Sequence, residues 1–225
     1  GIAMPAVISV TRTIIGTIVG IVCTSMVAYT LSRRDFVLRK PFQLLFVITM
    51  YVSGGMIPEY LLIIRTLKLG NNFMVYILPG LMWVYNMILV RSYIDGLPMA
   101  LQEAAKLDGA NDFQIWYKVV MPLCKPVIAT VGLYYAVGQW NSYFNALIYI
   151  RSESLQPLQI VLRSILVGNQ TMSAMSTGAA AVEAKQMADL IKYAIIVVSS
   201  APIMCMYPLV QKYFNQGVML GSLKG

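Results

Sequence analysis

The sequence predicts an all-α fold, a polytopic bundle of membrane-spanning helices, from its composition and from the spacing of its charges. Hydrophobic residues make up 58% of the 225 residues and charged residues only 12%, whereas a soluble domain carries roughly 25% charged residues. Five long stretches contain no Asp, Glu, Lys or Arg, and each approaches or exceeds the about 20 residues with which a helix crosses a bilayer. Water is therefore not the main solvent of this chain.

The five expected spans form one transmembrane domain over residues 1–225. They cover residues 13–32, 41–58, 73–90, 126–150 and 193–211. A charged residue at the centre of a membrane helix costs roughly 2.5–3.5 kcal/mol on insertion scales, which accounts for the uncharged interiors. An intramembrane relay for protons or ions is accordingly not expected.

The basic residues predict the orientation of the chain. Four of them lie on the short connection between the first two spans, namely Arg33, Arg34, Arg39 and Lys40. Because such loops tend to stay in the cytoplasm, alternation places residues 96–125 and the tail 212–225 in the cytoplasm and residues 151–192 outside. Gly1 then starts outside, and we expect the intact protein to have a sixth span before it. The same clusters fit membrane orientation better than nucleic-acid binding.

Several chemistries are excluded by residues that the sequence lacks. There is no histidine, so His-based acid–base catalysis, a Ser-His-Asp triad and an imidazole metal site are ruled out. Cys23 and Cys205 lie within apolar runs and Cys124 borders one, as expected of packing residues rather than of a disulfide framework. No Gly-x4-Gly-Lys-Ser/Thr loop for ATP occurs. We expect no catalytic residue, metal or cofactor in this chain.

The loop between the third and fourth spans, residues 96–125, predicts a helix, a turn and a second helix. Pro98 suits a first helical turn, and Gly109 can adopt the left-handed conformation that ends a helix. Asn111 and Gln114 have the spacing of a capping box for the second helix. Two short helices joined at an angle are therefore expected outside the membrane.

The second of these helices carries an apolar ridge. Phe113, Trp116, Tyr117 and Val120 follow the three-and-four spacing of one helical face. Such a ridge on a loop outside the membrane predicts binding to a partner protein. The alternative is an amphipathic hairpin that packs beneath its own bundle, and the periodicity alone does not decide between the two.

The order of residues in this loop resembles the coupling loop of bacterial importer permeases. That signature is Glu-Ala-Ala, three residues, Gly, nine residues, Ile, one residue and then Leu-Pro. The matching positions are Glu103, Ala104, Ala105, Gly109 and Pro122. Val119 replaces the Ile and Met121 replaces the Leu, and both substitutions preserve apolar bulk.

The resemblance extends over nearly the whole chain, to the maltose-type carbohydrate permeases and, within them, to a subgroup that handles complex oligosaccharides. The further segments that carry it are residues 54–60, 140–147, 157–159 and 211–225. It implies the permease subunit of a type I ABC importer in the bacterial inner membrane. The implied partners are a second homologous permease, two ATPase subunits that bind ATP and Mg, and an external solute-binding protein that delivers an oligosaccharide.

The resemblance also implies roles for particular residues. The loop would dock in a cleft of an ATPase subunit, with Glu103 against a basic residue there. The implied ATPase-coupling residues are Glu103, Ala104, Ala105, Gly109, Phe113, Trp116 and Pro122. The implied ATPase-contacting tail is Gly221, Ser222, Leu223, Lys224 and Gly225, for which a frayed terminus is the alternative. Residues 151–192 would contact the binding protein, or form a disordered linker.

The fourth expected span carries an unusual number of polar and aromatic residues for a lipid-facing helix. Those expected along a substrate pathway are Tyr135, Gln139, Trp140, Asn141, Tyr143 and Asn145. The alternative is that the amides join helices by hydrogen bonds worth about 0.6–2 kcal/mol and that the aromatic residues lie in an interfacial belt. Glu59, at the edge of the second span, is expected to pair with Arg65 or to contact a ligand.

Two other classes of protein were weighed against the importer permease. An ion-coupled secondary transporter normally has internal repeats and an intramembrane ionisable residue, and neither is visible in the expected spans. A membrane enzyme would need a constellation such as paired carboxylates, but the acidic residues lie in loops or at span edges. The expected solute is an oligosaccharide. An acidic oligosaccharide, such as a fragment of alginate or pectin, is the alternative. The expected spans contain no Arg or Lys that would favour an acidic solute.

Overall fold

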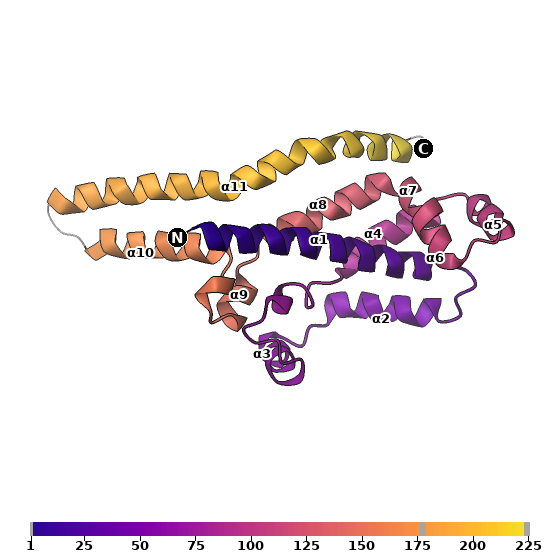
Figure 1. Cartoon of the computed structure of the whole chain (residues 1–225), viewed down its shortest axis with the longest axis horizontal. Helices are drawn as coiled ribbons and strands as arrows, with labels where there is room; N and C mark the ends of the chain where they lie inside the picture. Colours follow the sequence, from indigo (N-terminus) through magenta and orange to yellow (C-terminus); the bar gives the residue numbers. More distant parts are fainter. Residues whose placement is uncertain (1, 176–178, 223–225) are drawn as a thin grey trace.

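The computed structural model describes residues 2–175 and 179–222, and this part of the chain is helical without any β-strand. This confirms the all-α prediction. Helix α1 (Ala3–Ser32) runs through the body of the molecule, where it packs against α4 (Val84–Asp95) and α8 (Lys125–Asn141) (Figure 1). The core therefore lies between one long helix and two shorter ones.

Helix α1 approaches α8 closely through two glycines. A Cβ atom on Gly16 would lie 2.7 Å from Nε2 of Gln139, and one on Gly20 would lie 2.9 Å from a ring carbon of Tyr135. Small residues at a membrane helix interface let the backbones approach in this way. Because the helix begins at Ala3, it also contains Arg12, which the expected span 13–32 leaves out.

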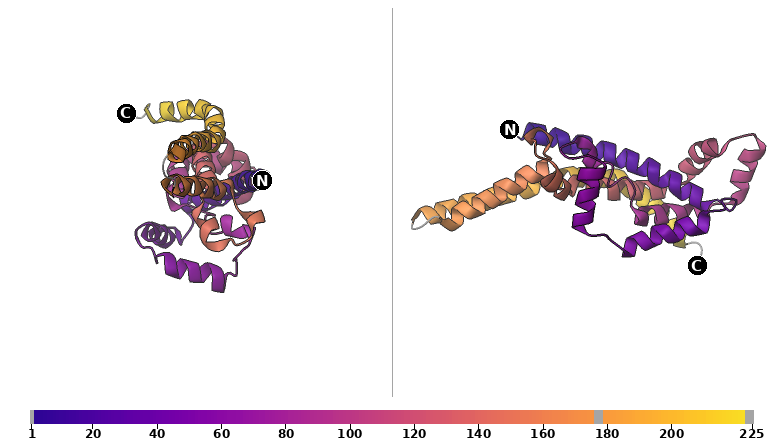
Figure 2. Two further views of the ribbon diagram at one scale, coloured as in Figure 1. Left: turned by 90° about the vertical axis from the view of Figure 1, so that its left-hand side faces the viewer. Right: turned by 90° about the horizontal axis from the view of Figure 1, so that it is seen from below.

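The second expected span is a broken helix. Helix α2 (Arg39–Tyr51) ends at a stretch containing Gly54 and Gly55, and α3 (Met56–Leu61) with the π-helix η1 (Leu62–Thr66) then runs at 114° to it. Gly55 has a φ of +85°, which L-residues with a side chain rarely adopt. Figure 2 shows the change of direction between α2 and α3. The expected span 41–58 is therefore not a single straight helix, and the break lies at the glycine pair.

The third expected span is helical only in its second half. A 3-10 turn, η2 (Phe73–Tyr76), is followed by irregular backbone up to α4. Pro79 and Gly80 lie in this irregular stretch, where the ring of proline and the freedom of glycine both disfavour a helix. Side chains of α8 bind the backbone that is left free: Gln139 Nε2 donates to the carbonyl of Tyr76 at 3.3 Å, and Trp83 N donates to the hydroxyl of Tyr135 at 2.9 Å. Irregular backbone at membrane depth needs such partners.

The remaining helices also differ from the expected pattern. Helix α8 ends at Asn141 and the chain continues as α9 (Phe144–Tyr149). Residues 151–192, expected as a loop, contain the 3-10 turn η4 (Glu153–Leu155), helix α10 (Leu158–Met175) and the start of α11 (Ala179–Ser222). Helix α10 and the first part of α11 lie side by side and extend away from the body, and α11 then runs along α8 (Figures 1 and 2).

The number of uninterrupted spans is smaller than the sequence predicts. Among the described residues, two helices are long and apolar enough to cross a membrane, Ala3–Ser32 and Lys185–Pro208, and up to four spans result if each bent pair is one span. The bent pairs are Arg39–Tyr51 with Met56–Thr66, and Asp112–Leu123 with Lys125–Asn141. Hydropathy detects an apolar stretch but not a break in its backbone, which explains the difference.

Candidate functional site: a hairpin and a polar cavity

The predicted helix, turn and helix between α4 and α8 are present. Helix α5 (Met99–Leu107) has Pro98 as its N-cap residue, and Gly109 in the turn has a φ of +81°. Helix α6 (Asp112–Ile115) begins with the capping box: Gln114 N donates to Oδ1 of Asn111 at 2.8 Å, and Asn111 N donates to Oε1 of Gln114 at 3.0 Å. The local sequence signals are therefore confirmed. We refer to residues 96–125 as the hairpin.

The apolar ridge of the hairpin is divided between two faces. Trp116 and Val120 are only 6% and 1% exposed, and they pack with Ile115 in the core against α1 and α4. Phe113 and Tyr117 remain 60% and 64% exposed. Ala105 is half-buried against the same core as Trp116. The prediction of a single partner-facing ridge is therefore wrong.

A π-helix follows Phe113 within this ridge. Residues Trp116–Val120 form the π-helix η3, after which the N–H of Met121 bonds to the carbonyl of Trp116, five residues earlier. The three-and-four spacing assumes the i to i−4 bonds of an α-helix, so it does not apply across η3. Helix α7 (Met121–Leu123) then leads into α8.

The exposed face of the hairpin includes most of the residues implied by the resemblance. Glu103, Ala104, Gly109, Phe113 and Pro122 are exposed. Leu107, which the sequence analysis did not select, is 89% exposed at the end of α5. A single exposed leucine is no signal by itself, but the same hairpin also exposes Phe113 and Tyr117. We call Glu103, Ala104, Leu107, Phe113 and Tyr117 the hairpin surface.

A polar network joins the hairpin to the end of α1. Arg33 Nη1 donates to Oε1 of Gln102 at 3.0 Å, and its Nη2 lies 3.2 Å from Asp35 and 3.5 Å from Asp112. Lys106 Nζ lies 3.3 Å from the same oxygen of Asp35. A hydrogen bond from its own backbone amide, followed by the one from Arg33, lowers the pKa of Asp35 below its usual value. The network keeps the first hairpin helix attached to the connection between α1 and α2.

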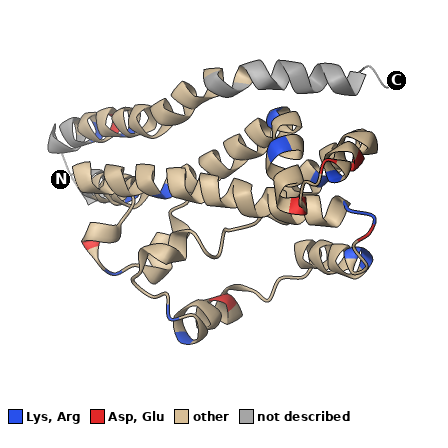
Figure 3. Ribbon diagram, turned by 45° about the vertical axis from the view of Figure 1, so that its right-hand side comes forward, with Lys and Arg blue, Asp and Glu red and all other residues tan. Residues whose placement is uncertain are grey.

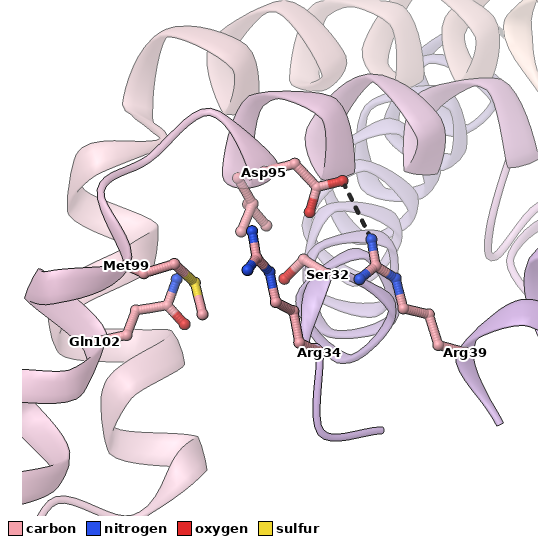
Figure 4. Close-up of a pocket in the computed structure, with 7 residues that line it drawn as sticks. Ser32, Arg34, Arg39, Asp95, Met99 and Gln102 are labelled. Atoms are coloured by element: carbon pink, nitrogen blue, oxygen red, sulfur yellow. Dashed lines mark ion pairs between the residues drawn. The ribbon is translucent and has the colours of Figure 1, made fainter. Parts of the chain in front are cut away.

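Further basic side chains from that connection lie beside the hairpin. Figure 4 shows a cavity of about 230 Å³ between them. Its labelled lining residues are Ser32, Arg34, Arg39, Asp95, Met99 and Gln102. Arg39 forms an ion pair of 3.8 Å with Asp95. Charged residues of both signs gather at this end of the molecule (Figure 3).

A second cavity, of about 220 Å³, lies between α1, α3, the irregular stretch before α4 and the turn between α8 and α9. We call it the polar cavity. It is lined by Arg12, Glu59, Tyr76, Pro79, Gly80, Trp83, Gly138, Gln139, Ser142 and Asn145. Two of the predicted pathway residues, Gln139 and Asn145, are therefore found together at one cavity. Arg12 is a residue that the sequence analysis missed, because the expected first span begins one position after it.

The other predicted pathway residues lie elsewhere. The hydroxyl of Tyr135 is 2.6 Å from Oγ1 of Thr24 and accepts from Trp83 N, so this buried residue joins α8 to α1. Trp140 Nε1 donates to the carbonyl of Ser199 at 2.8 Å and joins α8 to α11. Both aromatic residues therefore join helices, a role that the sequence analysis considered only for the amides. The remaining two, Asn141 and Tyr143, are exposed, and Arg163 covers the ring of Tyr143 at 4.8 Å.

The implied C-terminal contact is described only in part. Gly221 and Ser222 end helix α11, whereas Leu223, Lys224 and Gly225 lie outside the described residues.

An all-helical membrane chain with an exposed hairpin between two of its apolar segments has the architecture of an importer permease. The chain belongs to the family described as binding-protein-dependent transport system inner membrane component, whose sequence pattern matches residues 16–220. The predicted family is therefore confirmed, and this chain is a membrane component of such a transport system.

Similar proteins support this assignment over nearly the full chain. The polygalacturonan/rhamnogalacturonan transport system permease protein YtcP of Bacillus subtilis (strain 168) is 41% identical over 97% of this chain and 76% of its own length. Protein LplC of the same organism is 38% identical over 97% of this chain and 73% of its own. A crystal structure of a bacterial ABC transporter involved in the import of the acidic polysaccharide alginate superposes with a TM-score of 0.73 at 36% identity, covering 92% of this chain and 74% of the other.

Proposed function

We propose that this chain is the permease subunit of an ATP-driven importer that translocates an oligosaccharide delivered by an external solute-binding protein. Family membership supports the permease role. The similar permease YtcP and the solved transporter are both named for the transport of polymeric sugars. In this proposal the chain has no enzymatic activity, and the ATP and Mg that drive transport bind to two partner ATPase subunits.

The hairpin surface is the proposed contact with an ATPase subunit. The observation that carries this assignment is the division of the hairpin, because one face is buried in the core of this chain while Leu107, Phe113 and Tyr117 are left 89%, 60% and 64% exposed. Aromatic and large apolar anchors contribute most to interfaces when a partner covers them. Glu103 supplies one charge at the edge of this surface. The opposite face, through Trp116, transmits a movement of the hairpin to α1 and α4.

The proposed assembly contains a second, homologous permease subunit. The exposed side of α11 is consistent with such a partner, because α11 packs on α8 and α10 but Lys185–Pro208 has no fully buried residue in its most apolar part. In this assembly the hairpin and the C-terminal tail face the cytoplasm of a bacterial cell. The basic residues beside the hairpin support that orientation.

The first experiment tests the contact with the ATPase. The chain would be tagged, expressed with its neighbouring genes and purified in mild detergent, with copurified ATPase measured for the wild type and for Glu103→Lys. Glu153→Lys is the matched control, since Glu153 is also an exposed glutamate but lies in η4, away from the hairpin. We expect Glu103→Lys to reduce the copurified ATPase and the control to retain it. If the wild type brings down no ATPase, the chain does not work as proposed, and an ion-coupled transporter becomes the better candidate.

A further inference from the structure

Arg12 is a buried cation inside an apolar helix. It lies within α1, a helix that is long and apolar enough to cross a membrane, and only 1% of the residue is exposed. A charged residue within a membrane segment is costly and commonly marks a path for a substrate or an ion. Arg12 therefore requires an explanation that packing alone does not give.

One edge of the Arg12 guanidinium is fixed by the end of α8. Its Nε donates to the carbonyl of Gln139 at 3.1 Å, and its Nη2 donates to that carbonyl and to the carbonyl of Ser142, the latter at 2.6 Å. These carbonyls are at the C-terminus of a helix, where the last carbonyls lack partners and the dipole is negative. The guanidinium also lies 4.8 Å from the centre of the Tyr76 ring. The side chain is thus held in one position.

The other edge of the guanidinium has no partner. Nη1 of Arg12 is buried and donates to no hydrogen-bond acceptor in the described part of the chain. Among the described residues no carboxylate lies within ion-pair distance of Arg12. Buried charges in proteins are normally paired, so this donor has the properties expected of a site for an anion that arrives from outside the chain.

The surroundings of Arg12 fit a sugar that carries the anion. Arg12 lines the polar cavity together with the amides of Gln139 and Asn145 and the indole of Trp83, which offer hydrogen bonds and an aromatic surface. The cavity of about 220 Å³ is smaller than the roughly 300–1,000 Å³ of pockets that enclose a drug-sized ligand. It suits one unit of an oligosaccharide rather than the whole chain of sugars.

We propose that the polar cavity is a carboxylate-recognising subsite in which Nη1 of Arg12 donates to the carboxylate of a uronic acid unit. The translocated solute is then an acidic oligosaccharide. The sequence had argued against such a solute because no expected span contains Arg or Lys, and the presence of Arg12 inside α1 removes that argument. A charge-assisted bond from a fixed guanidinium favours this unit over its neutral counterpart. This inference rests on the proposed function.

Glu59 is an acidic residue that also lines the polar cavity. Its side chain is exposed, and it forms no ion pair with Arg12 among the described contacts. In the proposed subsite it does not neutralise Arg12. A purely structural Arg12–Glu59 pair would be the competing explanation, and it predicts the same loss of stability for Arg12→Gln and Glu59→Gln.

The test measures sugar binding to the purified complex of this chain with its partner permease and ATPase. The probes are trigalacturonate and trimannuronate, compared with neutral galactotriose and mannotriose, by titration calorimetry. We expect one acidic trimer to bind about tenfold or more tightly than its neutral counterpart, as a charge-assisted bond permits. Arg12→Gln should abolish that preference, and Arg12→Lys should retain part of it because the charge remains but the planar fork is lost. Glu59→Gln should keep or increase the preference for the acidic trimer.

A second variant covers the case in which Arg12→Gln does not fold. Asn145→Asp leaves every contact of Arg12 with α8 intact and places a carboxylate at the same cavity, so it should weaken binding of the acidic trimer selectively. Equal affinities of the wild type for acidic and neutral trimers, or an unchanged preference in Asn145→Asp, would overturn the subsite. Copurified ATPase in the same preparation tests the proposed function separately. If no ATPase copurifies, the importer function is contradicted; if ATPase copurifies, a negative result of the binding experiment contradicts only the subsite.

Discussion

Arg33 at the end of α1 donates a hydrogen bond of 3.0 Å to Oε1 of Gln102 in α5, so the first hairpin helix is joined by a side chain to the longest helix of the body. Gln102 is itself buried, at 4% exposed. On the other side of the hairpin, Trp116 packs in the core with residues of the same α1 helix. Two independent contacts therefore connect the hairpin to α1, as the proposed transmission of movement from an ATPase to the membrane helices requires.

Removing the first of these contacts should loosen the hairpin. Arg33→Ala deletes the hydrogen bond to Gln102 and the ion pairs to Asp35 and Asp112. We expect a loss of about 1–2 kcal/mol in the free energy of unfolding, less than the sum of such bonds because both carboxylates are exposed to solvent. We also expect fewer sugars transported per ATP hydrolysed in the reconstituted importer.

Arg34→Ala is the control for that variant. It removes the same charge from the same connection, but Arg34 is exposed and forms no ion pair in the part of the chain that is described. A comparable loss of coupling in Arg34→Ala would mean that the net charge of the connection matters rather than the Arg33–Gln102 contact.

The two faces of the hairpin should respond differently to substitution. Leu107→Asp changes a side chain that is 89% exposed, so the permease should keep its thermal stability while its binding to the ATPase weakens. Trp116→Ala opens the core instead, and such truncations destabilise by about 3–5 kcal/mol. Thermal unfolding of the isolated permease and pull-down of the ATPase separate the two effects. An unstable Leu107→Asp permease would show that this residue packs within its own chain.

Local signals in the hairpin could be predicted from the sequence, whereas the course of the spans could not. Asn111, Gln114 and Gly109 act within one turn of their own position, so their effect on the backbone does not depend on the rest of the fold. The break in the backbone before Trp83 has a local signal in Pro79 and Gly80, but the path of the broken backbone depends on distant partners, because Tyr135 in α8 accepts the hydrogen bond of Trp83 N. A hydropathy pattern does not predict such contacts between distant residues.

The residues of the candidate sites could likewise be predicted only where their signals are local in the sequence. The residue order around Glu103 identifies the hairpin, but it does not tell which of its aromatic residues packs in the core, as Trp116 does, and no propensity in the sequence marks the π-helix η3. Arg12 was missed because a search for uncharged stretches ends at any charged residue. In the structure, the carbonyls at the end of α8 accept hydrogen bonds from Arg12 and so accommodate its charge. Only the fold brings residues 12 and 139 together.

The close approach of α1 to α8 gives a further prediction. Gly16→Ala would place a Cβ atom 2.7 Å from Nε2 of Gln139, so the two helices must separate or Gln139 must leave its position in the polar cavity. Overpacking of this kind costs about 1–3 kcal/mol. We expect a lower melting temperature and weaker sugar binding.

Gly168→Ala is the matched control. Gly168 lies in α10, and a Cβ atom there would have no neighbour within 4 Å. Replacing a helical glycine by alanine without a clash stabilises by about 0.5–1 kcal/mol. A destabilised Gly168→Ala with an unaffected Gly16→Ala would contradict the packing of α1 against α8.

The hydroxyl of Tyr135 gives the last prediction, because it separates a structural role from a role in the pathway. This buried group lies 2.6 Å from Oγ1 of Thr24 and accepts from the N–H of Trp83. Tyr135→Phe would leave that N–H without an acceptor, and a buried unsatisfied group costs about 1–3 kcal/mol. Tyr134→Phe, at a neighbouring tyrosine that is 40% exposed, should change stability little. If Tyr135 joins helices rather than binding sugar, its variant lowers the melting temperature but leaves the preference for acidic over neutral trimers intact. A variant with normal stability and altered sugar preference would instead place Tyr135 on the substrate pathway.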